Sequence, residues 1–179
     1  EGESVPRLRF PEFESAGEWE EKTLEGVCEI NPSNGNLPES FIYIDLESVD
    51  AGQLISKKKI YRDDAPSRAQ RLLKNGDVIY QTVRPYQRNN FYCDFNDDNA
   101  YVASTGYAQL RAFGVSRFLY QLVHTETFVT KVIARCAGGN YPAINSSELA
   151  EIPVTIPADL NEQQRIAELL SALDEEISA

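Results

Sequence analysis

Alternating hydrophobic and polar positions in the middle of the chain predict β-strands. The run Phe-Ile-Tyr-Ile-Asp-Leu has the period of two that is typical of a half-buried strand, and similar short runs follow it between turn residues. We predict strands at 41–46, 54–61, 77–83, 89–95 and 100–113, the last interrupted by Gly106. Asn75-Gly76 is a strong turn signal, and Pro85 ends the third strand. The middle of the chain is therefore predicted to form a mixed β-sheet.

The hydrophobic period becomes helical after residue 115. Apolar residues at 118, 119, 122, 123, 128, 129, 132 and 133 predict one or two helices packed on the sheet between Ser116 and Arg135. Asn145 or Ser146 can cap a short helical turn that runs through Leu149. Ile-Pro-Val-Thr-Ile-Pro at 152–157 predicts a strand between two prolines, which places it at a sheet edge.

The last segment, 158–179, has no Gly or Pro and predicts a helix. Asp159 and Glu162 resemble a capping box at its start. Its apolar residues follow the spacing of a coiled-coil seam: Ile166, Leu170, Leu173 and Ile177. Two interpretations stay open, a helix that packs on its own domain and a seam that pairs with another helix. The break at Pro157 favours a helix that projects from the sheet.

Prolines and turn residues divide the segment before the first predicted strand. Pro-Arg-Leu-Arg-Phe-Pro-Glu-Phe at 6–13 predicts an extended arm, with Trp19 and Leu24 as the first core anchors. Residues 19–30 fit a short helix or a strand equally. Asn-Pro, Asn-Gly and Leu-Pro within 31–40 predict turns that separate this arm from the main fold.

Length and composition indicate one ordinary soluble domain. A chain of 179 residues, 42% hydrophobic and 25% charged, can bury one core but is short for two full domains. It has neither an apolar run of membrane-spanning length nor the apolar core of a signal peptide, so we expect a cytoplasmic location. Cys28, Cys93 and Cys136 are widely spaced without a Cys-x-x-Cys pair, so we expect reduced core residues.

Residue types needed for catalysis are sparse. His124 is the only histidine and lies in the apolar helical segment, where a packed histidine is more frequent than a catalytic base. The acidic residues lack the spacing of metal ligands, and the glycine motifs that bind phosphates or dinucleotides are absent. We therefore predict a non-catalytic protein that uses no metal or cofactor.

The distribution of charge is uneven. A net charge of −11 opposes nucleic-acid binding, because affinity for a duplex depends on neutralising phosphates. Residues 57–88, however, hold nine basic and three acidic residues, a net +6, while the remaining residues hold eight basic and 25 acidic ones, a net −17. This asymmetry favours a local basic footprint for an anionic partner, although a charged run is also a common solvated face.

Side chains that can read bases are interleaved with these charges. In the major groove, Arg can form two hydrogen bonds to guanine, and Asn or Gln can do so to adenine. The candidates for base reading follow the predicted strand 77–83: Arg84, Tyr86, Gln87, Arg88, Asn89 and Asn90. The other basic side chains suit phosphates: Lys57, Lys58, Lys59, Arg62, Arg68 and Arg71. Two other interpretations compete with DNA reading. One is a surface hairpin whose Arg and Lys residues pair with the acidic body of the chain. The other is a protein-interaction module whose basic loop binds an acidic partner.

Several motifs occur together in the last third of the chain. These are Gly139-Asn140-Tyr141-Pro142-Ala143-Ile144-Asn145, then Ile152-Pro153, Ile156-Pro157 and Glu162-Gln163-Gln164-Arg165-Ile166-Ala167. Upstream stand the arm with Trp19, then Asn75-Gly76-Asp77-Val78, Arg84-Pro85-Tyr86 and Ser104-Thr105-Gly106. The pattern, which covers most of the chain, resembles the specificity subunits of type I restriction-modification systems.

The resemblance implies an α+β target-recognition domain at 1–157 and a conserved helix at 158–179 for dimer or subunit packing. It implies sequence-specific binding of double-stranded DNA without catalysis by this chain. The implied partners are modification subunits, which methylate adenine, and a restriction subunit that is both motor and nuclease. Subunits of this family carry two recognition domains, and this chain has room for one. A half-subunit that forms a homodimer through the C-terminal helix, a natural truncation and a fragment all fit.

Overall fold

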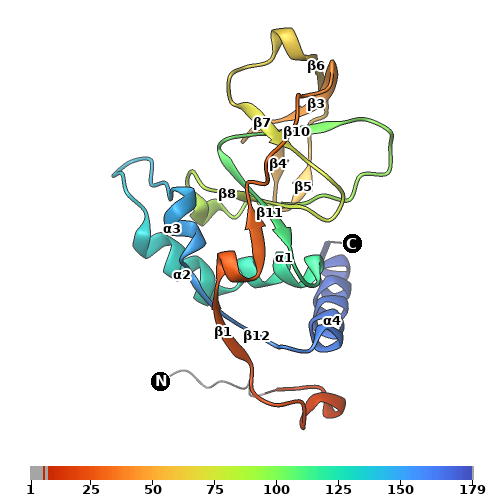
Figure 1. Cartoon of the computed structure of the whole chain (residues 1–179), viewed down its shortest axis with the longest axis vertical. Coiled ribbons are helices and arrows are strands. Elements are labelled where there is room, and N and C mark those ends of the chain that lie inside the picture. Colours follow the sequence, from red (N-terminus) through yellow and green to blue (C-terminus); the bar gives the residue numbers. More distant parts are fainter. Residues whose placement is uncertain (1–5, 7, 179) are drawn as a thin grey trace.

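A mixed four-stranded sheet lies at one end of the molecule, at the top of Figure 1. The computed structural model describes residue 6 and residues 8–178; Arg7 of the predicted arm lies outside this range. The strand order is β6 (Lys58–Tyr61), β3 (Ser40–Ile44), β10 (Tyr101–Ser104) and β7 (Ala69–Leu72). The strands β3 and β10 are parallel and the other pairs are antiparallel. The predicted mixed sheet and α+β class are confirmed.

A second four-stranded sheet is antiparallel and occupies the centre of the molecule. Its order is β2 (Cys28–Ile30), β11 (Tyr107–Ala112), β8 (Val78–Gln81) and β9 (Phe91–Tyr92). The turn at Thr105 and Gly106 separates β10 from β11, as the predicted interruption of strand 100–113 requires. The consecutive strands β10 and β11 thereby belong to different sheets, and this turn connects the two sheets.

Two short ribbons complete the β structure. The ribbon of β4 (Val49–Asp50) and β5 (Gln53–Leu54) has its turn at Ala51 and Gly52, both with positive φ. The ribbon of β1 (Glu20–Thr23) and β12 (Pro153–Ile156) pairs a strand from the N-terminal part of the chain with one from the C-terminal part. The predicted edge strand at 152–157 is therefore confirmed. The undecided segment 19–30 consists of β1, a 3-10 turn η2 (Leu24–Gly26) and β2.

Residues 54–61 do not form the single continuous strand that was predicted. Only its first residue belongs to β5, and β6 begins at Lys58. The chain leaves one ribbon here and crosses to the edge of the mixed sheet, where Lys59 pairs with Ile42. Ile55, in the crossing, is 65% exposed. An apolar residue in this crossing gave the segment the hydrophobic pattern of one strand.

Helices cover the central sheet on one side (Figure 1). The predicted helical segment forms α1 (Ser116–His124) and α2 (Glu126–Arg135), which meet at Thr125. The Thr125 side chain accepts a hydrogen bond from the Phe128 amide and so caps α2. Asn145 caps α3 (Ser146–Ala150) in the same way. The last helix is α4 (Leu160–Ser178), and no helix in the described range is long and apolar enough to cross a membrane.

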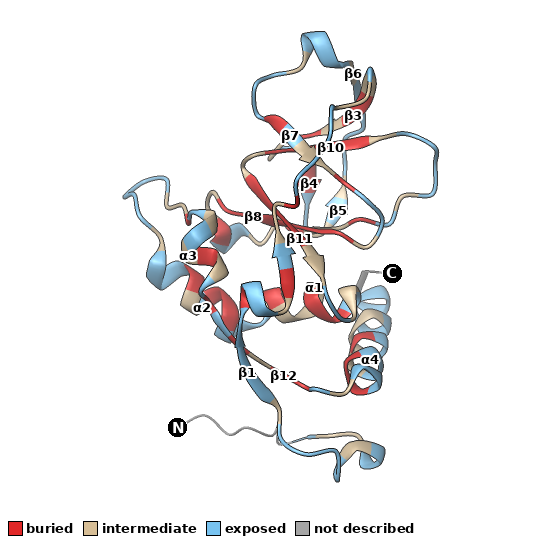
Figure 2. Ribbon diagram, viewed as in Figure 1, coloured by how far each residue is buried: buried red, intermediate tan, exposed pale blue. Residues whose placement is uncertain are grey.

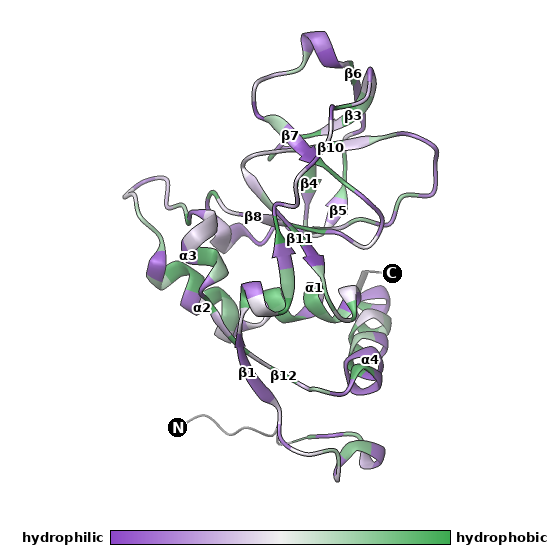
Figure 3. Ribbon diagram, viewed as in Figure 1, coloured by the Kyte–Doolittle hydropathy of each residue, from purple (hydrophilic) through white to green (hydrophobic). Residues whose placement is uncertain are grey.

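Buried residues lie on both sheets and on the helices (Figure 2), and those within the described range form three groups. The largest lies between the central sheet and the helices, the second lies between the two sheets, and the third covers the other face of the mixed sheet. Cys28 and Cys93 are buried, Cys136 is partly buried, and all three are free thiols. Burial raises the pKa of the Cys28 thiol to about 12, which keeps it unreactive. The surface ribbon strand β1 is hydrophilic along its length (Figure 3).

Candidate nucleic-acid interface

A tight turn follows β8 and carries the residues predicted to read bases. The 3-10 turn η4 (Pro85–Gln87) is bounded by Arg84 and Arg88, whose φ angles of 54° and 55° are left-handed. Non-glycine residues in this conformation cost about 1–3 kcal/mol each and gather at ligand sites, where the surrounding structure enforces them. Tyr86, at the tip, is 51% exposed. The turn is a strained and exposed loop on a buried strand.

The Gln81 side chain holds this turn in its conformation. It is buried, and its Nε2 donates to the Val83 carbonyl at 2.7 Å and to Oε1 of Gln87 at 2.9 Å. Its Oε1 accepts from the backbone amide of Asn89 at 3.2 Å. One amide side chain therefore ties together both ends of the turn. Such a loop can present side chains to a partner without a large ordering cost on binding.

The prediction that Asn90 reads a base is wrong. Asn90 is 1% exposed, and both ends of its amide are used inside the protein. Its Oδ1 accepts from the Gln81 amide at 2.8 Å, and its Nδ2 lies 3.2 Å from Nε2 of His124. The neighbouring Asn89 is partly buried and its Oδ1 accepts from the Ala51 amide at 3.3 Å. Asn90 is part of the support of the loop because burial leaves it no access to a ligand.

The arginines of the turn differ in their electrostatic surroundings. Arg88 donates to Glu126 of α2 at 2.7 Å and forms an ion pair with it. Arg84 has no ion pair within the described residues, and its guanidinium lies 4.4 Å from the centre of the Tyr141 ring. Arg84, Tyr86 and Gln87 are therefore the predicted base-reading residues that the turn presents most directly.

The basic residues predicted to contact phosphates occupy two opposite edges of the mixed sheet. Lys58 and Lys59 lie on β6, the strand at one edge, whereas Arg71 lies on β7 at the other. Arg62 and Arg68 lie in the connection between these strands. The sequence segment 57–88 therefore does not form one continuous strip, because two strands separate β6 from β7.

Two of these basic residues have distinctive environments. Lys57 forms an ion pair with Asp97 at 3.5 Å, and its pKa is raised by Tyr101 and Asp97. The Nε atom of Arg71 is buried and has no hydrogen-bond partner within the described range, and burial lowers the pKa of this guanidinium. Lys57 is thus partly neutralised, whereas Arg71 retains an unused donor.

The single histidine has a structural environment. His124 Nδ1 lies 2.7 Å from the Tyr120 carbonyl, which can only accept, so Nδ1 carries the proton and Nε2 accepts from Asn90. Burial lowers the pKa of His124, which favours this neutral form. Within residues 6 and 8–178, no group of His, Cys, Asp and Glu has an arrangement that could hold a metal ion.

The predicted packing helix α4 does not project from the fold as the break at Pro157 had suggested. It lies against α1 (Figure 2). Ala167 is buried and Ile166 packs against the largest core. Gln163 fixes its first turn, since its Nε2 donates to the Pro157 carbonyl at 2.8 Å and its Oε1 accepts from the Val115 amide at 3.3 Å. These hydrogen bonds hold the start of the helix against the domain.

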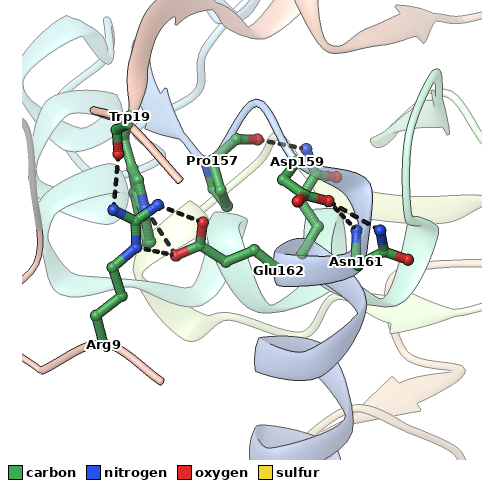
Figure 4. A network of polar contacts seen from close by, with 8 residues as sticks. Arg9, Trp19, Pro157, Asp159, Asn161 and Glu162 are labelled. Atoms are coloured by element: carbon green, nitrogen blue, oxygen red, sulfur yellow. Dashed lines mark hydrogen bonds and ion pairs between the residues drawn. The ribbon is translucent and has the colours of Figure 1, made fainter. Parts of the chain in front are cut away.

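The N-terminal arm also binds α4 (Figure 4). Both oxygens of Glu162, which is 1% exposed, accept hydrogen bonds from Arg9 at 2.7 Å, and Oε1 also accepts from Nε1 of Trp19 at 3.2 Å. Farther along α4 the apolar residues become exposed: Leu170 is partly buried, Leu173 is 44% exposed and Ile177 is 84% exposed. The predicted seam is therefore covered at its start and open at its end.

Sequence reasoning missed the residues that hold the turn and the loop beside it. Gln81 sits inside a predicted strand and has no sequence signal that separates it from other strand residues. Tyr141 lies in the Gly-rich segment between α2 and α3, and the contact with Arg84 joins segments far apart in the chain. A bridge between Val83 and Ala143 brings them together.

A rigid polar turn, basic residues at the edges of a sheet and helices that support the sheet are features of a domain that recognises a macromolecule. The chain belongs to the family described as the type I restriction modification DNA specificity domain, whose sequence profile matches residues 16–179.

One curated protein and two solved structures are similar to this chain. The chain is 26% identical, over 145 residues, to the type I restriction enzyme HindI specificity subunit of Haemophilus influenzae; the match covers 75% of this chain and 31% of that protein. It is 30% identical to the HsdS subunit of Thermoanaerobacter tengcongensis, with a TM-score of 0.73 over 89% of this chain and 43% of that one. A solved chain from work on complex assembly of the type I R-M system has a TM-score of 0.75 and 30% identity, over 97% and 45% of the two chains. This chain thus spans less than half the length of these relatives.

Proposed function

We propose that this chain is a DNA target-recognition domain that reads one half of the recognition site of a type I restriction-modification system. The observation that carries the proposal is the buttressed turn at 84–88, which presents Arg84 without an ion pair in the described range. Membership of the specificity-domain family supports the proposal. Reading a base needs donors and acceptors fixed in space and no chemistry on the DNA, which suits a turn tied down by Gln81.

The experiment is selection from a library of random-sequence duplexes. We expect the chain to enrich one short sequence, and we expect its affinity to fall steeply as salt rises, because phosphate contacts release counterions. Binding that depends on salt but enriches no sequence would contradict a recognition function. It would favour a general basic surface that binds an acidic partner instead.

Partner subunits are the second part of the proposal. The name of the HindI relative describes a specificity subunit of a restriction enzyme, so we infer that the chain directs modification subunits and a restriction subunit to its DNA site. The chemistry of methylation and cleavage then belongs to those subunits. Co-purification of the chain with a co-expressed modification subunit tests this assignment, and a chain that elutes alone would contradict it.

The open end of α4 supports a further proposal about assembly. Leu173 and Ile177 leave an apolar edge on a helix whose first turns are packed, and the chain spans less than half of its relatives. We infer that this edge packs against the corresponding helix of a second recognition half, either from another copy or from the same polypeptide. Sedimentation should detect self-association that Leu173→Glu with Ile177→Glu abolishes, with Glu176→Gln on the same helix as control. A monomer at high concentration would contradict the homodimer.

A further inference from the structure

The loop between α2 and α3 lies directly beside the turn at 84–88, at the left of Figure 1. Val83 and Ala143 form an antiparallel bridge. The Arg84 amide donates to the Pro142 carbonyl at 2.7 Å, and the Ile144 amide donates to the Thr82 carbonyl at 3.0 Å. These two hydrogen bonds make up the bridge and fix the second loop against the first. Any partner that contacts Arg84 meets both loops.

Tyr141 is the exposed side chain of this second loop. Its ring is 65% exposed, yet it lies under the Arg84 guanidinium at 4.4 Å from the ring centre. Arg84 forms no ion pair among the residues described, so the aromatic face is the contact that orients its guanidinium. A guanidinium stacked on an aromatic ring keeps its N–H groups, which lie in its own plane, available for a ligand.

The position of Tyr141 is itself fixed. Gly138 has a φ of 95°, and a Cβ there would lie 2.9 Å from the Tyr141 carbonyl oxygen, so the loop closes tightly on glycine. Ala137 and Ala143 form a second bridge across the loop. Buried Ile144 anchors the end of the loop. The backbone at Tyr141 is thus held by its own loop, and the ring contacts the Arg84 guanidinium.

We propose that Arg84 reads a guanine and that Tyr141 is the positioning residue that aims its guanidinium. This inference rests on the proposed DNA-recognition function. Guanine presents two acceptors, O6 and N7, in the major groove, and the paired N–H groups of one Arg edge match them. A free Arg side chain loses rotamer freedom when it forms such a pair of bonds. Stacking on Tyr141 restricts that freedom before DNA arrives, which increases selectivity at that base pair.

The test is duplex selection with the full chain and its variants. Arg84→Ala should lose the preference for guanine at one position of the selected sequence by about 5- to 150-fold. Tyr141→Ala should weaken the preference at the same position by about 2- to 5-fold, the range for an exposed cation–π contact. Tyr141→Phe should retain the preference, because it keeps the ring. Affinity for random duplexes should stay unchanged in both Tyr141 variants.

A double variant separates positioning from independent contact. In the Arg84→Ala background, Tyr141→Ala should have no further effect on the guanine position, because the residue it positions is absent. Arg165→Ala is the matched control, since Arg165 lies over the Phe10 ring on the side of the arm, at 5.3 Å, and should change no position.

The outcomes distinguish this inference from the proposed function. If the native chain selects a sequence but Arg84→Ala leaves every position unchanged, the inference is overturned and the recognition function stands. A Tyr141→Ala variant with an intact guanine preference, or one that alters a different position, also overturns the positioning role. If the native chain selects no sequence, the proposed function itself fails.

Discussion

Two buried tyrosines differ in a single hydrogen bond. Tyr80 is 1% exposed and its hydroxyl has no hydrogen-bond partner within the described residues, whereas the Tyr107 hydroxyl donates to the Asp45 carbonyl at 3.2 Å. A buried polar group without a partner costs stability, and a bonded one contributes a net amount of about 1 kcal/mol. We predict that Tyr80→Phe raises the free energy of unfolding by about 1 kcal/mol and that Tyr107→Phe lowers it by a similar amount.

Urea denaturation of the two variants checks this prediction. Each variant removes one oxygen and keeps the ring, so each serves as the packing control for the other. A loss of stability in Tyr80→Phe would show that its hydroxyl has a bonding partner, and the orphaned-hydroxyl interpretation would be wrong.

His124 makes stability depend on pH. Burial is the largest cause that lowers its pKa from 6.5, and the positive charge of Arg88 also lowers it; the hydrogen bonds to the Tyr120 and Arg88 backbone and the charge of Asp174 oppose the shift. The unfolded chain takes up a proton near pH 6.5 while the folded chain stays neutral. The stabilisation is therefore complete above that pH and is lost as the pH falls from 6.5 toward the lower folded pKa.

Because His124 is the only histidine, few other groups titrate in this range. We predict that the free energy of unfolding falls between about pH 7.5 and about pH 5.5, and that His124→Gln flattens this dependence. Chemical denaturation at the two pH values gives the result. An equally steep dependence in the variant would assign it to other groups.

At the scale of single residues, the chemical types of the candidate turn could be predicted, but the roles within it could not. Arg84, Gln87 and Asn90 stand in one polar run, and any of them could face DNA. The fold buries Asn90 and leaves Arg84 partly exposed because β9 returns to pair with β8 immediately after the turn. Burial of an amide depends on this return, which the local sequence does not encode.

At the scale of elements, the joint between the N-terminal arm and α4 depends on Glu162. The carboxylate binds Arg9 and the only tryptophan, Trp19 (Figure 4). We predict that Glu162→Ala releases the arm, because Arg9 and Trp19 lose their shared acceptor. Tryptophan emission should shift to longer wavelength as the indole becomes more exposed, and trypsin should cleave after Arg9 sooner.

Glu168→Ala is the matched control, because Glu168 is an exposed acid on the same helix. It should leave both the emission and the cleavage rate unchanged. Unchanged tryptophan emission in Glu162→Ala would show that other contacts hold the arm.

The helices and most strands could be predicted from their hydrophobic period, but their contacts could not. The spacing from Ile166 to Ile177 correctly predicts a helix with one apolar edge. The edge is covered at Ile166 and open at Ile177, although Gln121 of α1 still donates a hydrogen bond to Asp174, in the later turns of α4, at 2.8 Å. A repeat along one helix carries no information about where its partner ends. The burial of Glu162 could not be predicted either, because its hydrogen-bond partners come from the distant arm.

At the scale of the whole molecule, the topology divides a basic segment that is continuous in sequence. The strand order places Lys59 and Arg71 at opposite edges of the mixed sheet. The count of charges predicted a local excess of +6, and the fold spreads this excess over two edges and one turn. Strand order depends on long-range pairing such as the parallel contact of β3 and β10, which no local pattern specifies.

This division leads to a prediction about salt dependence. Lys58 and Lys59 have no ion pair within the described range, so each can release counterions when it contacts a phosphate. We predict that Lys58→Gln with Lys59→Gln weakens binding to all duplexes alike and lowers the salt slope by about two units. Lys57→Gln should have a smaller effect, because Lys57 is already paired with Asp97.

A chain of net charge −11 is repelled by DNA at long range, so removing any two positive charges weakens binding. Lys22→Gln with Arg165→Gln is the control: it removes the same charge from β1 and α4. This long-range repulsion is diffuse, whereas a phosphate contact releases bound counterions, so only the Lys58 and Lys59 pair should change the slope markedly. Filter binding over a range of salt concentrations measures both slopes. Equal slopes for the two pairs would remove the β6 edge from the DNA interface and leave only the turn at 84–88 and the β7 edge as candidates.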